Sequence, residues 1–432
     1  MKILLHSTAG DGVGLASQMS QEGHDVLLHL AGKKSRLYDG MLYKVDDWEK
    51  IATQSDLVIF DGNGMGGRAD SLRARGVKVW NGGALADALE KDRSFGMKAF
   101  EKAGIPTPET FKFGTASQAK EIVSANFRAR DRMVIKLDDF GACATSYVAR
   151  DRADMLAQIA TWEADPTIAR IDKGGIIQRF VEGVEISIEG WFNGTEFMYP
   201  FNVTMEDKCL LNGNKGPNTG CAQNVVWQLR NRAPKLSKMI VPLAPLLRKG
   251  NFVGQIDVNT IVAEDGSGPY ALEFTPRPGF DATSTLVLGL AGYAEACLAA
   301  VTGASELPLG QRPWDYLTAV RAWIPPYPFE STKPSFNAEL YDQIRGVPIE
   351  GWEQDDPRIL LYDAMVTDDD KVVMAGTNGI AFISLGSGRT LDQSVADCYR
   401  QLEAVQVPNL GYRTDLGERC RDGLGTVEGW LG

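Results

Sequence analysis

Two neighbouring apolar segments near the middle of the chain constrain the fold most. The first reads G-Q-I-D-V-N-T-I-V from Gly254 to Val262, and the second reads Y-A-L-E-F-T-P-R-P-G from Tyr270 to Gly279. Turn-forming residues from Glu264 to Gly268 separate them, and two β-prone segments joined in this way predict a β-hairpin. Each segment contains one carboxylate, Asp257 or Glu273, so the two carboxylates can face one another across adjacent strands.

Asp257 and Glu273 allow two interpretations. Burying a carboxylate is unfavourable unless it is paired or bound to a metal, and paired carboxylates suit a Mg²⁺ ion that carries substrate phosphates. Alternatively, both are structural ion-pair partners of arginines such as Arg277. The two strands by themselves leave both interpretations open.

Length and composition predict a multidomain α/β protein. A chain of 432 residues is too long to fold around one compact core, so two to four domains are expected. Hydrophobic content of 44% and charged content of 23% are typical of soluble globular proteins. No apolar segment is long enough to span a bilayer, and the one that begins at Met1 ends at His6, as in a first β-strand rather than a signal peptide. Six scattered cysteines indicate free thiols and a cytoplasmic location.

Charge and histidine content exclude several classes of function. The net charge is −11 and the basic residues form only short pairs, which opposes binding to a nucleic-acid backbone. The three histidines, His6, His24 and His29, all lie within the first thirty residues. A histidine-based catalytic triad or a zinc-binding helix elsewhere in the chain is therefore excluded, and carboxylates, lysines, arginines and metal must carry any chemistry.

The order of predicted elements suggests four units. Strands at 2–6, 25–30, 56–60 and 77–80 alternate with helices and form a βαβ domain. Its glycine-rich loop at 8–14 matches a dinucleotide fingerprint only in part, which argues against a dinucleotide site. Later predicted elements are helices over 85–103, 235–249, 285–302 and 391–402, a glycine- and asparagine-rich loop that ends at Gly220, and terminal strands after Trp314. We divide the chain into 1–104, 105–183, 184–310 and 311–432.

Four motifs follow one another in an order that resembles a known superfamily. Lys136 ends an apolar strand before a loop of mostly small residues, 138–146; then come Q-R-F-V-E-G-V-E at 178–185, K-G-P-N-T-G at 215–220 and the central hairpin. This order resembles the ATP-grasp ligases and, within them, the phosphoribosylamine–glycine ligase family. The resemblance covers nearly the whole chain and includes the stretches 89–95 and 377–379.

The resemblance implies a fold and a set of cofactors. The fold would be α/β, with α+β parts: a Rossmann-like N-terminal pre-ATP-grasp domain, ATP-grasp lid and central domains, and a β-rich C-terminal domain. The cofactors would be ATP and Mg²⁺ or Mn²⁺. Lys136 would place a cation on the ATP phosphates, and loop 138–146 would cover these phosphates with backbone N–H groups.

Further site residues follow from the same resemblance. The main chain of Gln178–Val181 would lie along the adenine, and Glu185 would accept hydrogen bonds from the ribose. The full set of nucleotide-binding residues would be Arg93, Lys136, Gln178, Arg179, Phe180, Val181, Glu185 and Lys208.

Metal and catalytic residues are implied in the same way. Asp257 and Glu273 would hold Mg²⁺ on the β- and γ-phosphates. Where the family usually has an asparagine two residues after the glutamate, this chain has Thr275, whose hydroxyl is also able to bind Mg²⁺. Arg277 would contact the transferring phosphoryl group and, with Lys136 and Asn218, would form the catalytic set.

Departures from the family gather where the amine substrate should bind. The family carries an arginine in its first loop that helps to hold a phosphorylated sugar, whereas this chain reads Ala9-Gly10-Asp11. An aspartate has the wrong charge for a phosphate site. Lys33, Lys34 or Arg68 could supply the missing positive charge. After G-P-N-T-G the family continues Gly-Met-Gly, but here the chain reads C-A-Q at 221–223.

These observations predict an ADP-forming C–N ligase. It would join a small amino acid such as glycine to an altered amine acceptor through an acyl phosphate. Two alternatives stay open: a genuine phosphoribosylamine–glycine ligase of purine biosynthesis, and a non-catalytic nucleotide-binding protein. The expected partners are a small-molecule carboxylate and an amine, without membrane or nucleic acid, and the chain would act as a monomer or homodimer.

Overall fold

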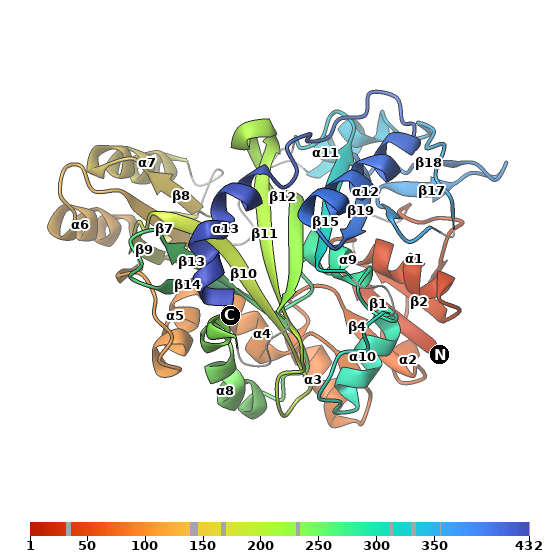
Figure 1. Cartoon of the computed structure of the whole chain (residues 1–432), viewed down its shortest axis with the longest axis horizontal. Coiled ribbons are helices and arrows are strands. Elements are labelled where there is room, and N and C mark those ends of the chain that lie inside the picture. Colours follow the sequence, from red (N-terminus) through yellow and green to blue (C-terminus); the bar gives the residue numbers. More distant parts are fainter. Residues whose placement is uncertain are drawn as a thin grey trace.

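The computed structural model of the chain describes all residues except 32–35, 139–145, 166–169, 230–233, 311–313, 330–333, 355 and 432. The described strands form three larger sheets and one two-stranded ribbon, and helices surround them (Figure 1). This mixed α/β architecture agrees with the predicted fold class.

The first sheet is parallel and is built from the N-terminal residues. Its strand order is β3 (Tyr43–Lys44), β2 (Asp25–Leu30), β1 (Lys2–Ser7), β4 (Leu57–Phe60) and β5 (Val79–Trp80). The connecting helices are α1 (Val13–Gln21), α2 (Trp48–Ala52) and α3 (Gly66–Ala74). Apolar runs in β1 and β4 are buried, as expected for parallel strands that helices cover on both faces.

The predicted helix over 85–103 is divided into α4 (Ala84–Lys91) and α5 (Arg93–Lys102). Asp92 separates them because its backbone is extended and its carboxylate accepts a hydrogen bond from the Phe95 N–H at 2.8 Å. This N-cap satisfies a backbone donor at the start of α5. It also places Arg93 at the first position of the new helix.

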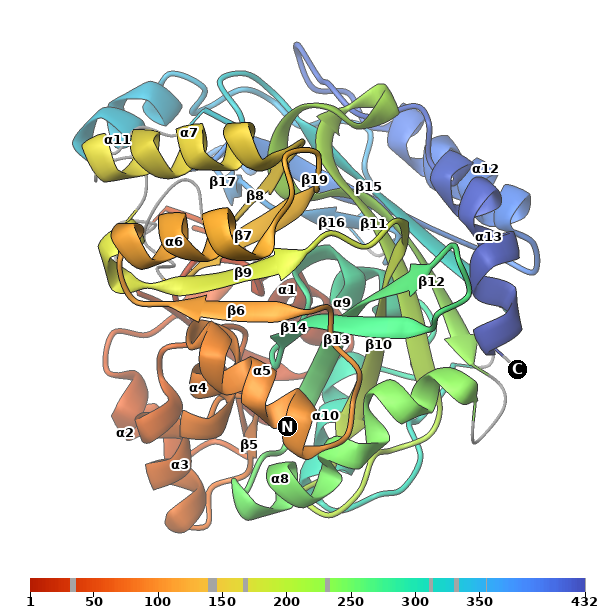
Figure 2. The same cartoon turned by 90° about the vertical axis from the view of Figure 1, so that its left-hand side faces the viewer.

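The second sheet is small and antiparallel. Its order is β6 (Thr110–Phe113), β9 (Gly175–Arg179), β7 (Met133–Leu137) and β8 (Ser146–Ala149). The helices α6 (Ala116–Asn126) and α7 (Arg152–Ala164) pack side by side against it (Figure 2), and the 3₁₀ turn η1 (Ile171–Lys173) precedes β9. These elements enclose a hydrophobic core of their own, which includes Phe113, Ile135 and Trp162.

The third sheet has eight antiparallel strands and contains the predicted hairpin. Its order is β14 (Pro269–Thr275), β13 (Gly254–Ala263), β10 (Gly183–Phe192), β11 (Phe201–Leu211), β12 (Lys215–Leu229), β15 (Tyr316–Trp323), β19 (Ile380–Gly388) and β16 (Ile359–Leu361). Strands β15, β19 and β16 come from the C-terminal region, yet β15 pairs directly with β12. The ribbon β17 (Ala364–Val366) and β18 (Val372–Met374) lies beyond this sheet.

The predicted loop that ends at Gly220 is instead part of a long antiparallel pair, β11 and β12. The chain reverses at the 3₁₀ turn η2 (Asn212–Asn214), where Gly213 and Asn214 have φ values of 66° and 54°. Glycine and asparagine tolerate this left-handed conformation. Their abundance therefore marks a tight reversal rather than a long irregular segment.

Two further predicted helices are interrupted. Residues 235–249 form the 3₁₀ turns η3 (Lys235–Met239) and η4 (Val241–Leu243) before α8 (Ala244–Lys249), because Pro242 and Pro245 lack the N–H that a continuous helix needs. Residues 285–302 divide between α9 (Phe280–Val287) and α10 (Tyr293–Val301). Gly289 lies between these helices and packs so closely on Trp314 that a side chain there would collide with the indole ring.

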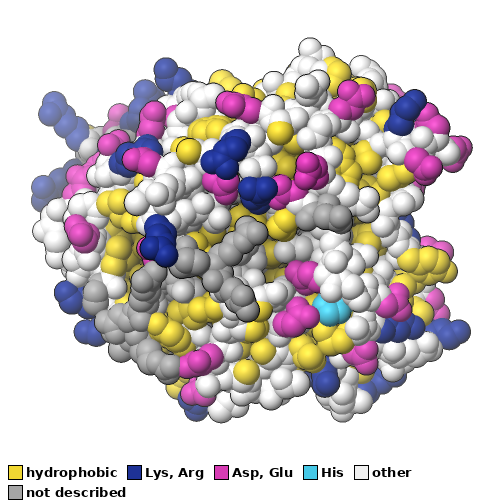
Figure 3. All heavy atoms as spheres, turned by 45° about the vertical axis from the view of Figure 1, so that its right-hand side comes forward, with side chains coloured by type: hydrophobic (Ala, Val, Ile, Leu, Met, Phe, Trp, Pro, Cys, Tyr) yellow, Lys and Arg dark blue, Asp and Glu magenta, His cyan; other side chains and the backbone are white. Residues whose placement is uncertain are grey.

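The C-terminal region adds α11 (Pro334–Asp342), α12 (Leu391–Ala404) and α13 (Glu418–Leu431). On the face seen in Figure 3, acidic and basic side chains are interspersed. Among the helices of the described residues, none has the length and apolar character needed to cross a membrane.

Candidate active site

A cavity of about 630 Å³ lies where the three sheets approach one another. Its walls come from the loop after β1, from α4 and α5, from β11 to β14, and from the C-terminal region. The charged and aromatic side chains among its lining residues are Asp11, Glu90, Arg93, Glu206, Lys208, Asp257, Glu273, Phe274, Arg277, Arg321, Tyr327, Tyr341 and Tyr362.

Polar side chains of the hairpin share one face and line this cavity. Asp257 is opposite Thr275 and Asn259 is opposite Glu273 in the register of β13 and β14. Because side chains alternate between the faces of a strand, all four point to the same side. Asp257 and Glu273 are therefore diagonal neighbours, as the sequence predicted.

Glu273 is held by two cations from other elements. Arg93 Nη1, at the start of α5, lies 2.5 Å from Glu273 Oε2, and Lys136 Nζ, on β7, lies 3.3 Å from the same oxygen. Burial raises the pKa of Glu273, but Lys136 and Arg93 lower it by more, so the pKa lies below its ordinary value. Glu273 is thus ionised, and it connects the second sheet to the third.

Asp257, unlike Glu273, is affected most strongly by negative charges among its charged neighbours. It is buried, and its Oδ1 atom has no hydrogen-bond partner among the described residues. Burial, together with the negative charges of Glu206 and Glu189, raises the pKa of Asp257 well above its ordinary value. A carboxylate in this situation is stabilised by a bound cation.

Glu185 and Lys208 form a second ion pair beside the cavity. Lys208 Nζ, on β11, donates to Glu185 Oε1, on β10, at 2.6 Å. Burial raises the pKa of Glu185, but the Lys208 ammonium outweighs it and the pKa is lowered. Both residues were predicted for the nucleotide site, and the structure places them together.

Arg277 is paired with Glu90. Its Nη2 atom lies 2.9 Å from Glu90 Oε1, and Glu90 also accepts a hydrogen bond from the Asn63 side chain. The interpretation of Arg277 as the ion-pair partner of Glu273 was therefore wrong, because Arg93 and Lys136 fill that position. Asn218 lies on β12 at the cavity wall, where its Oδ1 accepts from the Gly220 N–H at 2.9 Å.

The side chains of Gln178–Val181 are not among the residues that line the cavity. Gln178 is buried and donates to Thr110 Oγ1 at 3.0 Å. Arg179 is paired with Glu109 at 2.8 Å. Their predicted contacts with a nucleotide involve the main chain, and these side-chain positions are compatible with that. Most of the predicted phosphate loop, 139–145, lies outside the described residues, as do Lys33 and Lys34.

Several cavity residues were missed by the sequence analysis. Asn259 could have been found from the alternation D-V-N in its strand, because it is two residues from Asp257. Glu90 lay within the stretch 89–95, but nothing there indicated its partner. The three tyrosines at the C-terminal wall carry no sequence signal, since they come from separate segments that only the fold brings together. These tyrosines are Tyr327, Tyr341 and Tyr362.

Asp11 and Tyr362 form another part of the cavity wall. The Tyr362 hydroxyl donates to Asp11 Oδ1 at 2.9 Å. Nearby, the Asp363 carboxylate accepts hydrogen bonds from the backbone N–H groups of Thr377, Asn378 and Gly379 at 2.8 to 2.9 Å. This ordered loop places Asn378 at the cavity wall.

Comparisons with known proteins agree with this geometry. Residues 91–282 match the family model described as "Phosphoribosylglycinamide synthetase, ATP-grasp (A) domain". A phosphoribosylamine–glycine ligase from Leifsonia xyli subsp. xyli is 26% identical over 363 residues, which cover 82% of this chain and 82% of that protein.

Solved structures show the same fold. A phosphoribosylamine–glycine ligase from Thermotoga maritima superposes with a TM-score of 0.73 at 19% identity, over 96% of this chain and 100% of the other. The biotin carboxylase domain of 2-oxoglutarate carboxylase from Hydrogenobacter thermophilus, in complex with MgADP, gives a TM-score of 0.62 at 11% identity, over 100% and 98%.

The family match covers the α5 arginine, the Lys136 strand, the Glu185–Lys208 pair and the carboxylate hairpin, all of which contribute to the cavity or contact a residue that lines it. The chain is therefore an ATP-grasp enzyme, an ADP-forming C–N ligase whose residues 91–282 match the ATP-grasp domain of phosphoribosylglycinamide synthetase.

Proposed function

We propose that the protein is an ATP-dependent carboxylate–amine ligase that activates glycine or another small amino acid as an acyl phosphate and transfers it to an amine other than phosphoribosylamine. The observation that carries this proposal is the hairpin face, where Asp257 and Glu273 line one cavity with Arg93 bound to Glu273 and Arg277 close by. Such a set suits the negative charge of a nucleoside triphosphate and its metal ions.

The residues fit a magnesium or manganese ion. Asp257 is buried with an unpartnered carboxylate oxygen among the described contacts, and Glu273 and Thr275 offer oxygen atoms on the same strand face. Oxygen ligands of this kind match hard divalent cations. When bound there, the ion would neutralise charge on the transferring phosphoryl group.

The chemistry needs no protein nucleophile. An oxygen of the substrate carboxylate attacks the γ-phosphorus of ATP, and the bond to the β-phosphate oxygen breaks to release ADP. The lone pair of a neutral amine then attacks the acyl carbon, the bond to the phosphate oxygen breaks, and phosphate leaves with the electron pair while the amine nitrogen loses a proton. Positioning and charge neutralisation supply the catalysis.

Individual side chains have separate tasks in this proposal. Lys136 and Arg93 hold Glu273 in its ionised form and place positive charge beside the phosphates. Glu185 accepts from the ribose hydroxyls and Lys208 keeps it ionised. Arg277, oriented by Glu90, contacts the phosphoryl group as it moves to the acceptor, and Asn218 lies at the wall where the acyl phosphate would form.

A second candidate is phosphoribosylamine–glycine ligase itself. The names of the curated relatives and of the Thermotoga maritima structure favour it. Against it, Asp11 stands where the family has an arginine, and Arg68 is paired with Glu49 at 2.8 Å and lines a separate surface hollow. We therefore favour a ligase with an altered amine acceptor over phosphoribosylamine–glycine ligase.

The test is ADP release with Mg-ATP and glycine, with and without freshly generated phosphoribosylamine. Hydroxylamine is added in a parallel reaction, because it captures an acyl phosphate as a hydroxamate whatever the natural acceptor is. Glycyl hydroxamate with little response to phosphoribosylamine supports the proposal. Strong turnover that depends on phosphoribosylamine would establish the second candidate, and absence of both hydroxamate and ADP would refute glycine as the carboxylate.

A further inference from the structure

We propose that the acceptor amine carries a second positively charged group and no phosphate, and that this group binds at the part of the cavity wall formed by Asp11, Tyr362 and their neighbours. This proposal rests on the proposed function, and it names the class of the acceptor substrate. Three independent features of the described residues support it.

The first feature is the start of α1, which already holds an anion from the protein itself. Helix N-termini bind phosphates because their backbone N–H groups are unsatisfied and the helix dipole is positive there. Here the Gly12 N–H donates to Asp61 Oδ2 at 2.6 Å, and the Gly10 N–H donates to Ser7 Oγ at 2.8 Å. Asp61 is only 4% exposed. Two of the backbone donors that a phosphate would use are therefore occupied by buried protein groups.

The second feature is the closeness of two carboxylates. Burial and the nearby charge of Asp11 raise the pKa of Asp61 to about 7, because a negative neighbour disfavours the ionised form of Asp61. A phosphate dianion would add to this repulsion, whereas an ammonium group would relieve it. Arg277 and Arg321 also line the cavity, and both form hydrogen bonds with other groups. The charge of Arg277 acts on both Asp61 and Asp11, but its guanidinium is bound to Glu90 at 2.9 Å. Arg321 donates to Thr219 O and to the Tyr327 hydroxyl.

The third feature is the aromatic wall. Tyr327, Tyr341 and Tyr362 line the cavity together with Asn378. Aromatic faces attract ammonium groups electrostatically, most strongly where water is excluded. Tyr362 also donates to Asp11 Oδ1 at 2.9 Å, which fixes the carboxylate at the wall. A carboxylate that accepts from a tyrosine hydroxyl, in a cavity lined by further tyrosines, suits an ammonium group.

The reaction would use the two amines differently. The amine near the hairpin must be neutral, because its lone pair forms the bond to the acyl carbon while phosphate leaves. The amine at Asp11 stays protonated and forms no covalent bond. Its charge therefore contributes to binding and orientation of the acceptor rather than to the transfer step itself.

Three amines that share a four-carbon chain test the proposal directly. Binding of 1,4-diaminobutane, butylamine and 4-aminobutyl phosphate is measured by calorimetry with the full-length protein saturated with Mg-ADP. These probes differ only in whether the far end is an ammonium, a methyl or a phosphate group. We expect the diamine to bind about tenfold or more tightly than butylamine, and the phosphate to bind more weakly than either.

Variants identify the residues responsible. Asp11→Asn should reduce the preference for the diamine to about twofold, by removing the paired charge, without weakening butylamine binding. Tyr362→Phe, which retains the ring but removes the hydroxyl bound to Asp11, should produce a smaller loss. Asp172→Asn serves as the matched control, since Asp172 pairs with Arg170 on the surface, and should leave all three affinities unchanged.

The outcomes separate this proposal from the proposed function. Equal affinities, absence of diamine binding, or tightest binding of 4-aminobutyl phosphate would overturn it, the last by showing that the acceptor site prefers a phosphate. The hydroxylamine assay is independent of the acceptor. Hydroxamate formation without a diamine preference would overturn only the acceptor class, and diamine preference without hydroxamate would overturn only the ligase chemistry with glycine.

Discussion

Arg277 and Glu90 form a two-contact ion pair across the site: Nε and Nη2 of Arg277 lie 3.2 and 2.9 Å from Glu90 Oε1. Glu90 belongs to α4 and Arg277 follows β14, so the pair joins the N-terminal helices to the carboxylate hairpin. Two contacts fix the plane of a guanidinium more firmly than one. The orientation of Arg277 toward the cavity therefore depends on a residue from another part of the chain.

Replacing Glu90 with glutamine should impair transfer more than nucleotide binding. Glu90→Gln removes the charge that orients Arg277 but preserves the side-chain shape. We expect kcat for ADP release to fall by about 10- to 100-fold, with the KM for ATP within about twofold. Steady-state kinetics provides the measurement. A change in KM for ATP alone would show that Glu90 serves nucleotide binding instead.

Replacing Glu273 with glutamine should abolish metal-dependent turnover. Glu273→Gln removes a proposed metal ligand and leaves Arg93 and Lys136 without their shared anion. We expect ADP release to fall by at least about 100-fold. Glu163→Gln, on the exposed surface of α7, is a matched control. Turnover close to that of the wild type would remove Glu273 from the metal site.

Asn259 should position the Thr275 hydroxyl. Its Nδ2 donates to Thr275 Oγ1 at 3.3 Å, and its Oδ1 accepts from Ser187 Oγ at 3.1 Å. Asn259→Ala should raise the Mg²⁺ concentration for half-maximal ADP release about tenfold, because groups that orient metal ligands affect affinity on that scale. Asn126→Ala, on exposed α6, is the control. An unchanged Mg²⁺ dependence would exclude the Asn259–Thr275 pair from the metal site.

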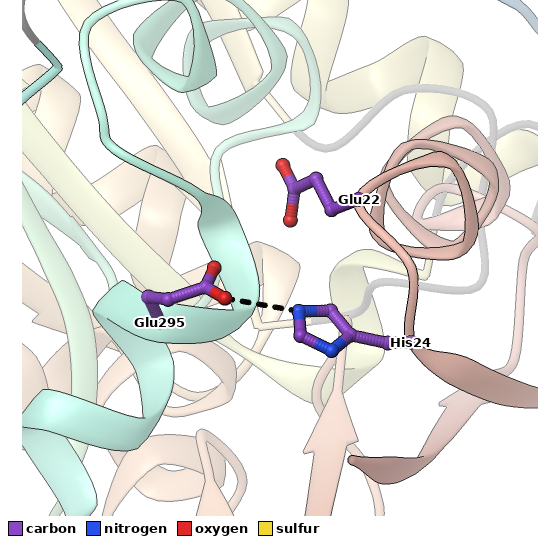
Figure 4. Close-up of side chains that lie close together, drawn as sticks. All are labelled: Glu22, His24 and Glu295. Atoms are coloured by element: carbon purple, nitrogen blue, oxygen red, sulfur yellow. Dashed lines mark hydrogen bonds and ion pairs between the residues drawn. The ribbon is translucent and has the colours of Figure 1, made fainter.

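Glu22 should make stability depend on pH. Figure 4 shows its carboxylate near His24 and Glu295, which pair with one another at 3.1 Å. Burial and the charge of Glu295 raise the pKa of Glu22 from 4.5 to about 7. The folded state thus prefers the protonated carboxyl, and its stabilising contribution is present below the unfolded pKa and is lost as the pH rises toward about 7.

The measurement for Glu22 compares melting temperatures of wild type and Glu22→Gln, which mimics the protonated form. At about pH 5 the two should agree closely, and at about pH 8 the variant should be more stable by roughly 1 kcal/mol, after allowance for solvent screening of a partly exposed group. Glu339→Gln, on the exposed face of α11, provides the comparison. A variant that is less stable at about pH 8 would contradict this expectation.

Local sequence patterns predicted the hairpin correctly, because turn residues between β-prone segments act over short distances. Helix lengths were less predictable. The break at Asp92 depends on a helix cap. Between α9 and α10, Gly289 packs against Trp314. The hydrophobic periodicity of the sequence reveals neither feature. The pairing of β15 with β12 is likewise a long-range contact that no local pattern encodes.

In the candidate site, too, local motifs were predicted from the sequence and long-range contacts were not. Residues that carry a motif, such as Lys136, Asp257 and Glu273, were proposed from the sequence and are brought together by the fold. Their partners were not, since Glu90 binds Arg277 across 187 positions of the chain. The aromatic wall near Asp11 needed the structure, because its tyrosines come from separate C-terminal segments.

The eight-stranded sheet fixes distances between residues that line the cavity. Asp257 on β13 and Arg321 on β15 belong to one hydrogen-bonded sheet, so strand spacing fixes the distance between their positions in the cavity lining. If the proposed function is correct, substitutions near one edge of that framework would change the amine that binds without altering the spacing of the ATP-binding residues. Divergence would then alter the acceptor-binding residues and leave the ATP-binding residues in place.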